Sequence, residues 1–292
     1  MNYNCPNPKC ENYKKHDYVR KDGFYFRKND SRKIRRFRCS LCGQRFSQST
    51  QTLEYRQKKR RVNFKLWQLL CSGISMRRSA KILKIHRITV RRKLDYLSKK
   101  CNIKNELFLK ELQQNPTQHI QFDDLITIEH TKLKPLSVTI AVDTNTLKIL
   151  GTAVSRIPAF GHLAQMSRDK YGYRKSTHFE MATKLFRKIC KSINPDSIIE
   201  SDQHKMYPKI IKKFFPRAQY IQYKGGRGAI VGQGELKKLE YDPLFFINHT
   251  CAMLRANINR LIRKTWCTTK DPFELQKHLD IYMCFHNSVI KA

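Results

Sequence analysis

The chain has 292 residues, of which 59 are Lys or Arg and 23 are Asp or Glu, so its formal net charge is +36. This length predicts about two domains, or three if some are small. Residues 1–100 hold 29 of the basic residues and only six acidic ones, and a region this basic repels itself without a polyanion nearby. The charge favours nucleic acid as the partner. An anionic membrane surface is disfavoured, because the sequence shows no lipid-anchor motif and no sustained amphipathic helix.

No apolar run approaches the roughly 18 residues of a membrane span, and residues 1–5 lack the apolar core of a signal peptide. We therefore expect a cytoplasmic protein, associated with the nucleoid if the cell is a prokaryote. Thiols stay reduced in that compartment, so the ten cysteines need an account other than disulfides. Six of them lie among apolar residues and are expected to be small buried side chains: Cys71, Cys101, Cys190, Cys251, Cys267 and Cys284.

The other four cysteines form two close pairs within residues 1–50. Cys5 and Cys10 are separated by four residues, and Cys39 and Cys42 by two. Two such pairs with a longer excursion between them can give zinc the four thiolates of a tetrahedral site. About 50 residues can hardly bury enough core to fold without such a staple. The pattern predicts a small β zinc ribbon with structural Zn²⁺, and four unliganded thiols are the alternative.

Residues 51–115 show the helical spacing of apolar side chains. The stretches 64–71 and 76–85 are separated by a break in which Ser75 can cap the second helix. A turn at His86 leads to a third helical stretch, and residues 99–116 read as a helix end and a linker. The order predicts an all-α helix-turn-helix domain that binds DNA, and a plain three-helix bundle is the alternative. The outward face of the third helix offers the candidate DNA contacts Arg87, Thr89, Arg91 and Arg92, with Lys93 as a further candidate.

Residues 116–292 alternate between strand and helix patterns. The stretches 119–129, 136–142 and 148–155 predict three strands, and the turn signal at 143–146 makes the last two a hairpin. Helical spacing over 179–193 and 204–215 alternates with short strands at 197–202 and 218–223. This order predicts an α/β domain, a mixed sheet with helices on both faces. The tail, 261–287, reads as helical, with Trp266 packed inward.

Four short motifs in this region resemble insertion-sequence transposases of the DDE superfamily. The motifs are Gln121-Phe-Asp-Asp124, Lys148-Ile-Leu-Gly151, Ser201-Asp202 followed by Tyr207, and Asn248-His-Thr-Cys-Ala-Met-Leu-Arg255. Transposases of this kind also begin with a zinc ribbon and a helix-turn-helix, so the resemblance covers essentially the whole chain. It implies a multidomain protein: a zinc ribbon at 1–50, a helix-turn-helix domain and linker at 51–115, and an RNase H-like catalytic domain at 116–292.

In that family one acid lies on the first strand of the RNase H-like fold and a second follows the fourth strand. Asp123 and Asp202 fall at these places. Phosphodiester transfer can use two Mg²⁺ or Mn²⁺ ions to activate the nucleophile and stabilise the leaving oxygen, and such hard cations need oxygen ligands. The resemblance implies that Asp123 bridges the metals and that Asp202 binds one. Taken alone, Asp123 reads equally as a strand-end turn residue and Asp202 as a helix cap. Asp124 is a spare ligand or is exposed.

The third ligand position departs from the family pattern. Aligning Arg255 with the basic residue two turns after the third acid places Asn248 where many relatives have Glu. An amide oxygen can bind Mg²⁺ but carries no charge. Glu235 or Glu240 is the alternative ligand, and an inactive site is the remaining reading. Arg255 on the same helix is a candidate phosphate contact, and the glycine-rich loop at 224–235 lacks the ending of a nucleotide-binding P-loop.

The resemblance implies a transposase that binds the terminal inverted repeats of an insertion sequence. It would catalyse metal-dependent cleavage and strand transfer of double-stranded DNA at the transposon ends and the target. A homodimer or a higher synaptic assembly is expected, because two ends must be held together. The alternative is a non-catalytic DNA-binding protein, either a decayed transposase or a transcriptional regulator, and Asn248 is the residue that keeps it open.

Overall fold

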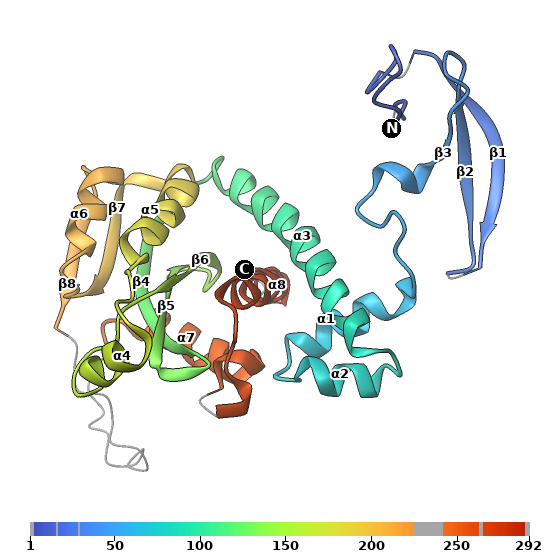
Figure 1. Ribbon diagram of the computed structural model, residues 1–292. Coiled ribbons are helices and arrows are strands. Elements are labelled where there is room, and N and C mark those ends of the chain that lie inside the picture. Colours follow the sequence, from blue (N-terminus) through green and yellow to red (C-terminus); the bar gives the residue numbers. More distant parts are fainter. Residues whose placement is uncertain (1–2, 16, 29, 225–241, 263–264, 290–292) are drawn as a thin grey trace.

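The computed structural model describes residues 3–15, 17–28, 30–224, 242–262 and 265–289 (Figure 1). The α-helices within these ranges are α1 (Asn63–Leu70), α2 (Met76–Ile82), α3 (Arg87–Leu112), α4 (Leu163–Tyr171), α5 (His178–Ile189), α6 (Tyr207–Phe214), α7 (Phe245–Asn257) and α8 (Pro272–Val289). Short 3-10 turns lie at Gln48–Gln51, Arg60–Val62, Cys190–Ser192, Asn259–Leu261 and Thr265–Cys267.

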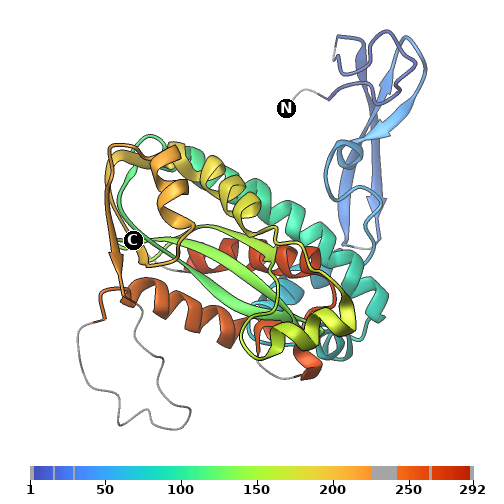
Figure 2. The ribbon, with the colours of Figure 1, turned by 60° about the vertical axis from the view of Figure 1, so that its left-hand side comes forward.

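The chain begins with a small antiparallel sheet in the order β1-β2-β3, formed by β1 (Val19–Arg27), β2 (Arg32–Cys39) and β3 (Arg45–Ser47). Both views show this sheet standing away from the rest of the molecule (Figures 1 and 2). Its interior is one stack of aromatic rings, Tyr3 on Phe37 on Phe46, together with a separate cluster of cysteines. A core this small agrees with the expectation that a metal is needed to hold the segment folded.

Helices α1 to α3 come next in the chain, and side chains cap the beginnings of α2 and α3. The Ser75 hydroxyl accepts a hydrogen bond from the backbone N–H of Arg78 and caps α2. Gly73, in the turn before α2, has a φ of +70°, and a Cβ there would lie 3.0 Å from the carbonyl oxygen of Ala256. Its N–H donates to the Asn257 carbonyl at 2.7 Å. Glycine is therefore required where this turn docks on the end of α7.

The third helix is longer than the sequence indicated. Helix α3 runs unbroken for 26 residues to Leu112, so most of the expected linker at 99–116 is helical. Lys93, expected on the outward face, is buried, and its ammonium group donates to the Asn63 side chain at 2.5 Å and to the Lys58 carbonyl at 3.1 Å. A buried lysine is tolerated only with such partners, so Lys93 belongs to the interior of the three-helix segment.

A five-stranded mixed sheet forms the centre of the remaining chain, in the order β6-β5-β4-β7-β8. Strands β4 (Thr117–Glu129), β5 (Thr131–Asp143) and β6 (Ile149–Arg156) are antiparallel neighbours. Strands β7 (Ile193–Asp202) and β8 (Gln219–Tyr223) extend the sheet in parallel with β4. The predicted turn at 143–146 is closed by the Asp143 carboxylate, which accepts hydrogen bonds from Asn145 N and Thr146 Oγ1.

Helices cover both faces of this sheet. One face carries α5 and α6, and the other carries α7, α8 and the three-helix segment, with a separate apolar core on each side. Alternation along β5 shows the division, because Val138, Ile140 and Val142 join the α7–α8 core while Ala141 joins the α5–α6 core. Gly151 lets α5 approach β6 closely, since a Cβ there would lie 2.5 Å from Leu185 Cδ1.

Three details of the second half differ from the expectations drawn from sequence. The tail is helical only from Pro272, after two short 3-10 turns, and not from residue 261. Trp266 is 85% exposed rather than packed inward. Helix α4 occupies residues 163–171, where no helix was expected.

Candidate functional site

The two predicted catalytic aspartates come together on neighbouring strands inside the central sheet, where β7 ends beside the middle of β4. Strand β4 pairs with β7 in parallel, with Ile120 beside Ile199 and Gln121 beside Glu200. Two residues further along each strand, the same register brings Asp123 next to Asp202. Adjacent strands lie ~4.8 Å apart and side chains at matched positions share a face, so both carboxylates lie on the side of the sheet that α7 covers.

The pKa values of the two carboxyl groups reflect this closeness. Burial, reinforced by the charges of Asp202 and Asp124, raises the pKa of Asp123 to about 7, although the charge of Arg255 opposes the shift. Burial also raises the pKa of Asp202. Two carboxylates in a partly desolvated space repel each other unless a cation lies between them. The pair therefore has the oxygen donors and the unbalanced negative charge that fit a divalent cation such as Mg²⁺.

Asp124 lies on the opposite face of β4 and plays a different part. Its carboxylate accepts hydrogen bonds from Thr139 Oγ1 at 2.6 Å and from the Tyr207 hydroxyl at 2.7 Å. His178 Nε2 lies 2.6 Å from the same group. Burial alone would raise the pKa of Asp124, but the hydrogen bond and charge of His178 lower it. Asp124 is therefore neither exposed nor a spare ligand: it is a buried acid whose oxygens already have partners.

A second set of polar residues, beside the aspartates, fixes the start of α7. The Gln121 side chain accepts from the backbone N–H of Ile247 at 3.1 Å and donates to the Pro243 carbonyl at 2.7 Å. It also donates to Glu200 at 2.8 Å. Glu200 in turn accepts from the Tyr223 hydroxyl at 2.9 Å. These contacts attach the first turn of α7 to the strands that carry Asp123 and Asp202.

The candidate third ligand, Asn248, lies on the first half of α7 and is exposed. Its amide nitrogen donates to the Asp242 carboxylate at 2.9 Å, and Asp242 also accepts from the backbone N–H of Leu244. The sequence did not single out Asp242; its position just before a helix was the only available signal. Further along α7, Arg255 is close enough to Asp123 to influence its pKa. The alternatives Glu235 and Glu240 lie outside the described residues.

The four cysteines predicted to bind zinc form one cluster. All four sulfur atoms lie within 4.8 Å of one another; Cys5 Sγ is 3.6 Å from Cys42 Sγ, and Cys10 Sγ is 3.9 Å from Cys39 Sγ. Zn–S bonds of about 2.3 Å put the sulfur atoms of a tetrahedral site about 3.8 Å apart. A disulfide needs about 2.05 Å, so these are thiols in metal-binding geometry, consistent with a structural Zn²⁺ site.

The predicted DNA contacts on α3 have two kinds of surroundings. Arg87 and Arg92 are exposed near the beginning of the helix, and Thr89 is half-buried between them. Arg91 is exposed too, but its guanidinium group forms ion pairs with Asp95 at 2.7 Å and with Glu274 of α8 at 2.8 Å. The structure thus presents Arg87 and Arg92 to solvent, half covers Thr89 and ties Arg91 to α8.

Comparison with known proteins identifies no family for this chain. No protein-family model matches the chain, and a search of curated proteins finds no match. None of the described helices is both long and apolar enough to cross a bilayer. The fold and site define a mixed α/β protein with an N-terminal four-cysteine cluster and a pair of carboxylates on the neighbouring strands β4 and β7.

Proposed function

We propose that this protein is a metal-dependent DNA transposase of the DDE superfamily, encoded by an insertion sequence. The observation that carries the proposal is the facing pair of Asp123 and Asp202 beside Arg255. Carboxylates on neighbouring strands can hold the Mg²⁺ or Mn²⁺ ions that support in-line displacement at phosphorus. The net charge of +36 supplies the attraction to DNA that such an enzyme needs.

In this proposal the chain's own residues have distinct roles. Asp123 and Asp202 would hold Mg²⁺ or Mn²⁺, and the metal would supply activation of the attacking oxygen and stabilisation of the leaving one. Arg255, near Asp123, contacts the phosphate being cut. Asn248 completes the site as an amide ligand, with Asp242 holding its side chain. Asp124 holds β4 in position from the opposite face of the sheet, through its contacts with Thr139, Tyr207 and His178.

The front of the molecule would hold the transposon ends. Helices α2 and α3 would act as a helix-turn-helix, with the beginning of α3 in the major groove and Arg87 and Arg92 directed at the DNA. Arg91 would leave Glu274 to reach a base or a phosphate. The four-cysteine cluster, read as a zinc ribbon, would present the basic strands β1 and β2 to the neighbouring backbone.

The test is a nicking assay on a supercoiled plasmid that carries the gene with its flanking DNA. We expect the wild-type protein to nick near the ends of the element with Mg²⁺ or Mn²⁺, and Asp123→Ala or Asp202→Ala to lower the rate at least a thousandfold. Asp196→Ala is the matched control, because Asp196 lies on the same strand but is exposed and paired with Arg217. It should nick at the wild-type rate.

The same assay weighs the rival, a non-catalytic DNA-binding protein. The observation that favours the rival is that Asn248 brings an amide, and not a carboxylate, to α7. Wild-type protein that binds the flanking DNA yet never nicks it with either metal would reject the enzyme and favour the rival. If the enzyme nicks, loss of activity in Asn248→Ala with retention in Asp242→Asn would support Asn248 as the ligand, and the reverse pattern would assign the role to Asp242.

A further inference from the structure

A large cavity lies away from the carboxylate pair, between the three-helix segment and the beginning of α8. Its volume is about 1310 Å³, and its walls come from α2, the first turns of α3 and the connection between α7 and α8. This volume exceeds the ~300–1,000 Å³ that suits a small molecule. The cavity therefore has room for several units of a polymer.

The outer part of the cavity is strongly basic. Arg77, Arg78, Lys81 and Arg87 line it and are exposed. Trp266, also in its wall, is 85% exposed. Positive side chains that follow a backbone, next to an aromatic ring on which a base can stack, are the two elements that bind single-stranded nucleic acid.

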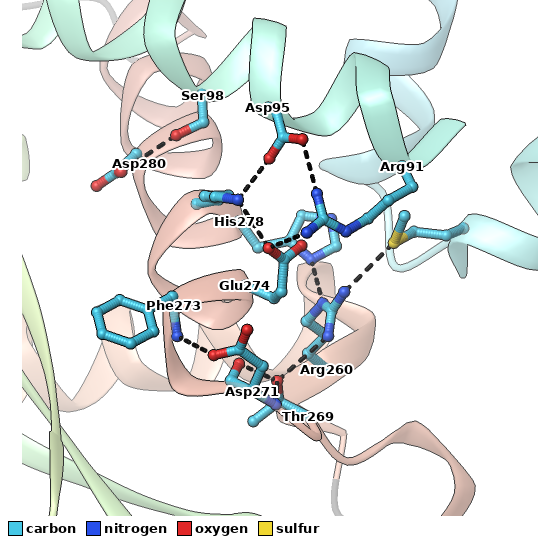
Figure 3. Close-up of polar contacts among 12 residues, drawn as sticks. Arg91, Asp95, Ser98, Arg260, Thr269, Asp271, Phe273, Glu274, His278 and Asp280 are labelled. Atoms are coloured by element: carbon cyan, nitrogen blue, oxygen red, sulfur yellow. Dashed lines mark hydrogen bonds and ion pairs between the residues drawn. The ribbon is translucent and has the colours of Figure 1, made fainter. Parts of the chain in front are cut away.

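The floor of the cavity is polar and buried (Figure 3). His278 is only 2% exposed, and its Nδ1 accepts a hydrogen bond from Arg260 Nε at 3.1 Å. Because the guanidinium can only donate, the ring proton of His278 is on Nε2. That N–H is buried and has no hydrogen-bond partner among the residues that the structure describes.

One turn earlier on α8, Glu274 presents the opposite kind of group. Its Oε1 forms an ion pair with Arg91 at 2.8 Å and accepts a hydrogen bond from Lys277 at 2.7 Å. Its Oε2 is buried and, within the described part of the chain, accepts no hydrogen bond. Glu274 and His278 are four residues apart and share one face of the helix. The floor therefore offers a donor and an acceptor side by side, both without a partner among the described residues.

The pairing of donor and acceptor selects the ligand. A phosphate oxygen could accept from His278 but would be repelled by Glu274. The edge of an unpaired nucleobase presents a donor and an acceptor together, and in duplex DNA the Watson–Crick edge is already occupied. A buried floor is also out of reach of a duplex backbone. We propose that this cavity binds an unpaired stretch of a DNA strand, with phosphates on the basic rim, one base on Trp266 and another on the floor.

The inference rests on the proposed function only in taking DNA as the polymer. If the strands separate at the processed ends, a cavity whose walls include α2 and the first turns of α3 would keep a freed strand from pairing again. Binding here does not require cutting, so the two proposals fail separately.

The chain has two tryptophans, which allows a direct measurement. In Trp67→Phe, Trp266 is the only tryptophan, and its fluorescence reports on the cavity. We expect a 12-nucleotide single strand to quench it and a blunt duplex of the same sequence to leave it unchanged. Ultraviolet crosslinking of a 5-iodouracil version to the wild-type protein should map to the peptide that contains Trp266.

Variants of the floor and rim sharpen the test. His278→Leu and Glu274→Leu should each weaken strand binding at least fivefold. Arg77→Ala with Arg78→Ala should reduce the slope of log K against log salt by about 0.7 for each phosphate that these side chains no longer neutralise. Lys184→Ala is the matched control, because this exposed lysine lies on α5 across the sheet, and it should bind as the wild type does. Far-UV circular dichroism checks that each variant is folded.

Three results would overturn the inference: equal quenching by the blunt duplex, a crosslink that maps elsewhere, or full competition by 10 mM inorganic phosphate, which would make the cavity a simple anion site. A protein that binds the strand yet never nicks keeps this inference and rejects the enzyme. One that nicks without any quenching of Trp266 keeps the enzyme and rejects this inference.

Discussion

Asp123 and Asp124 are neighbours in the chain, yet their carboxylates have opposite surroundings. Successive side chains of a strand point to opposite faces, so Asp123 meets Asp202 under α7 while Asp124 meets Tyr207 and His178 under α5 and α6. Burial and the neighbouring carboxylates raise the pKa of Asp123, whereas His178, Thr139 and Tyr207 lower the pKa of Asp124 despite its burial. A strand with two consecutive acids thus yields one candidate ligand and one anchor.

His278 gives a residue-scale prediction for stability against pH. Burial, aided by the charge of Arg260, lowers its pKa from 6.5 to about 3. The unfolded chain therefore binds more protons than the folded one between these values, and stability falls as the pH falls below 6.5. When the pH falls from 6.5 to 5, the protonation of this residue in the unfolded chain should lower the free energy of unfolding by about 2 kcal/mol.

The His278→Gln variant should therefore lose less unfolding free energy than the wild type over the same pH range. Urea unfolding at each pH measures the difference. Glutamine keeps an acceptor for Arg260 but does not titrate. His162→Gln is a suitable control, because His162 is an exposed histidine that precedes α4. It should keep the wild-type pH profile. Parallel pH profiles for wild type and His278→Gln would rule out this account of His278.

Residue patterns in the sequence foretold some of the site and missed the rest for a physical reason. Cysteine spacing predicted a cluster that the structure contains. The meeting of Asp123 and Asp202 is an expectation of the resemblance to DDE transposases and not of residue spacing. Gln121 and Asp242 act through contacts with α7, which lies more than a hundred residues from Gln121 along the chain. Local spacing carries no information about such partners. Trp266 misled because aromatic residues are buried more often than not.

At the scale of elements, the turn at Gly73 joins the three-helix segment to the α/β part. Its positive φ and the nearby Ala256 carbonyl leave no room for a side chain. Gly73→Ala should lower the unfolding free energy by about 1–3 kcal/mol, combining an unfavourable backbone conformation with a displaced neighbour. Thermal or urea unfolding measures the decrease.

Gly161 provides the matched control for this prediction. Its φ is also positive, +61°, but a Cβ there meets nothing within 4 Å. Gly161→Ala should therefore carry the cost of backbone strain alone, about 1 kcal/mol. Equal decreases in the two variants would mean that the close approach of Gly73 to Ala256 contributes nothing.

The strands were easier to foresee than the helix ends. Alternation along β4 and β5 and the turn at Asp143 are local signals, and the structure has both strands and the hairpin. Helix α3 continues to Leu112 because α8 packs along it: Asn102 and Asn105 donate to Asp280. These contacts come from residues far along the chain, so the local sequence alone predicts a linker for the same residues.

At the scale of the whole molecule, the N-terminal sheet has its own small core around the cysteines. Its described contacts with the segment that leads into α1 are polar ones, such as Arg61 with Ser31 and Arg60 with Asp30. Removing the metal should therefore unfold the sheet and leave the α/β part intact. Cys39→Ser, or chelation of zinc, should make residues 1–50 sensitive to protease while the remainder resists, as read by mass spectrometry.

Cys190→Ser is the control, since this cysteine lies outside the cluster. It should give the wild-type digestion pattern with and without chelator. Global unfolding on chelation, seen as disappearance of the whole far-UV signal, would show that the sheet and the rest of the protein are one cooperative unit and would contradict this division.

Helix α3 also sets a distance within the molecule. With a rise of 1.5 Å per residue, its 26 residues span ~39 Å, and Asp280, Lys277 and Glu274 hold it to α8 along the way. A continuous helix that α8 holds along its length fixes the distance between the end that carries Arg87 and the sheet that carries Asp123. If DNA is read at one end and cut at the other, the interval in base pairs should be fixed. Inserting about five base pairs, half a helical turn, between the recognised sequence and the cut should abolish nicking rather than move it.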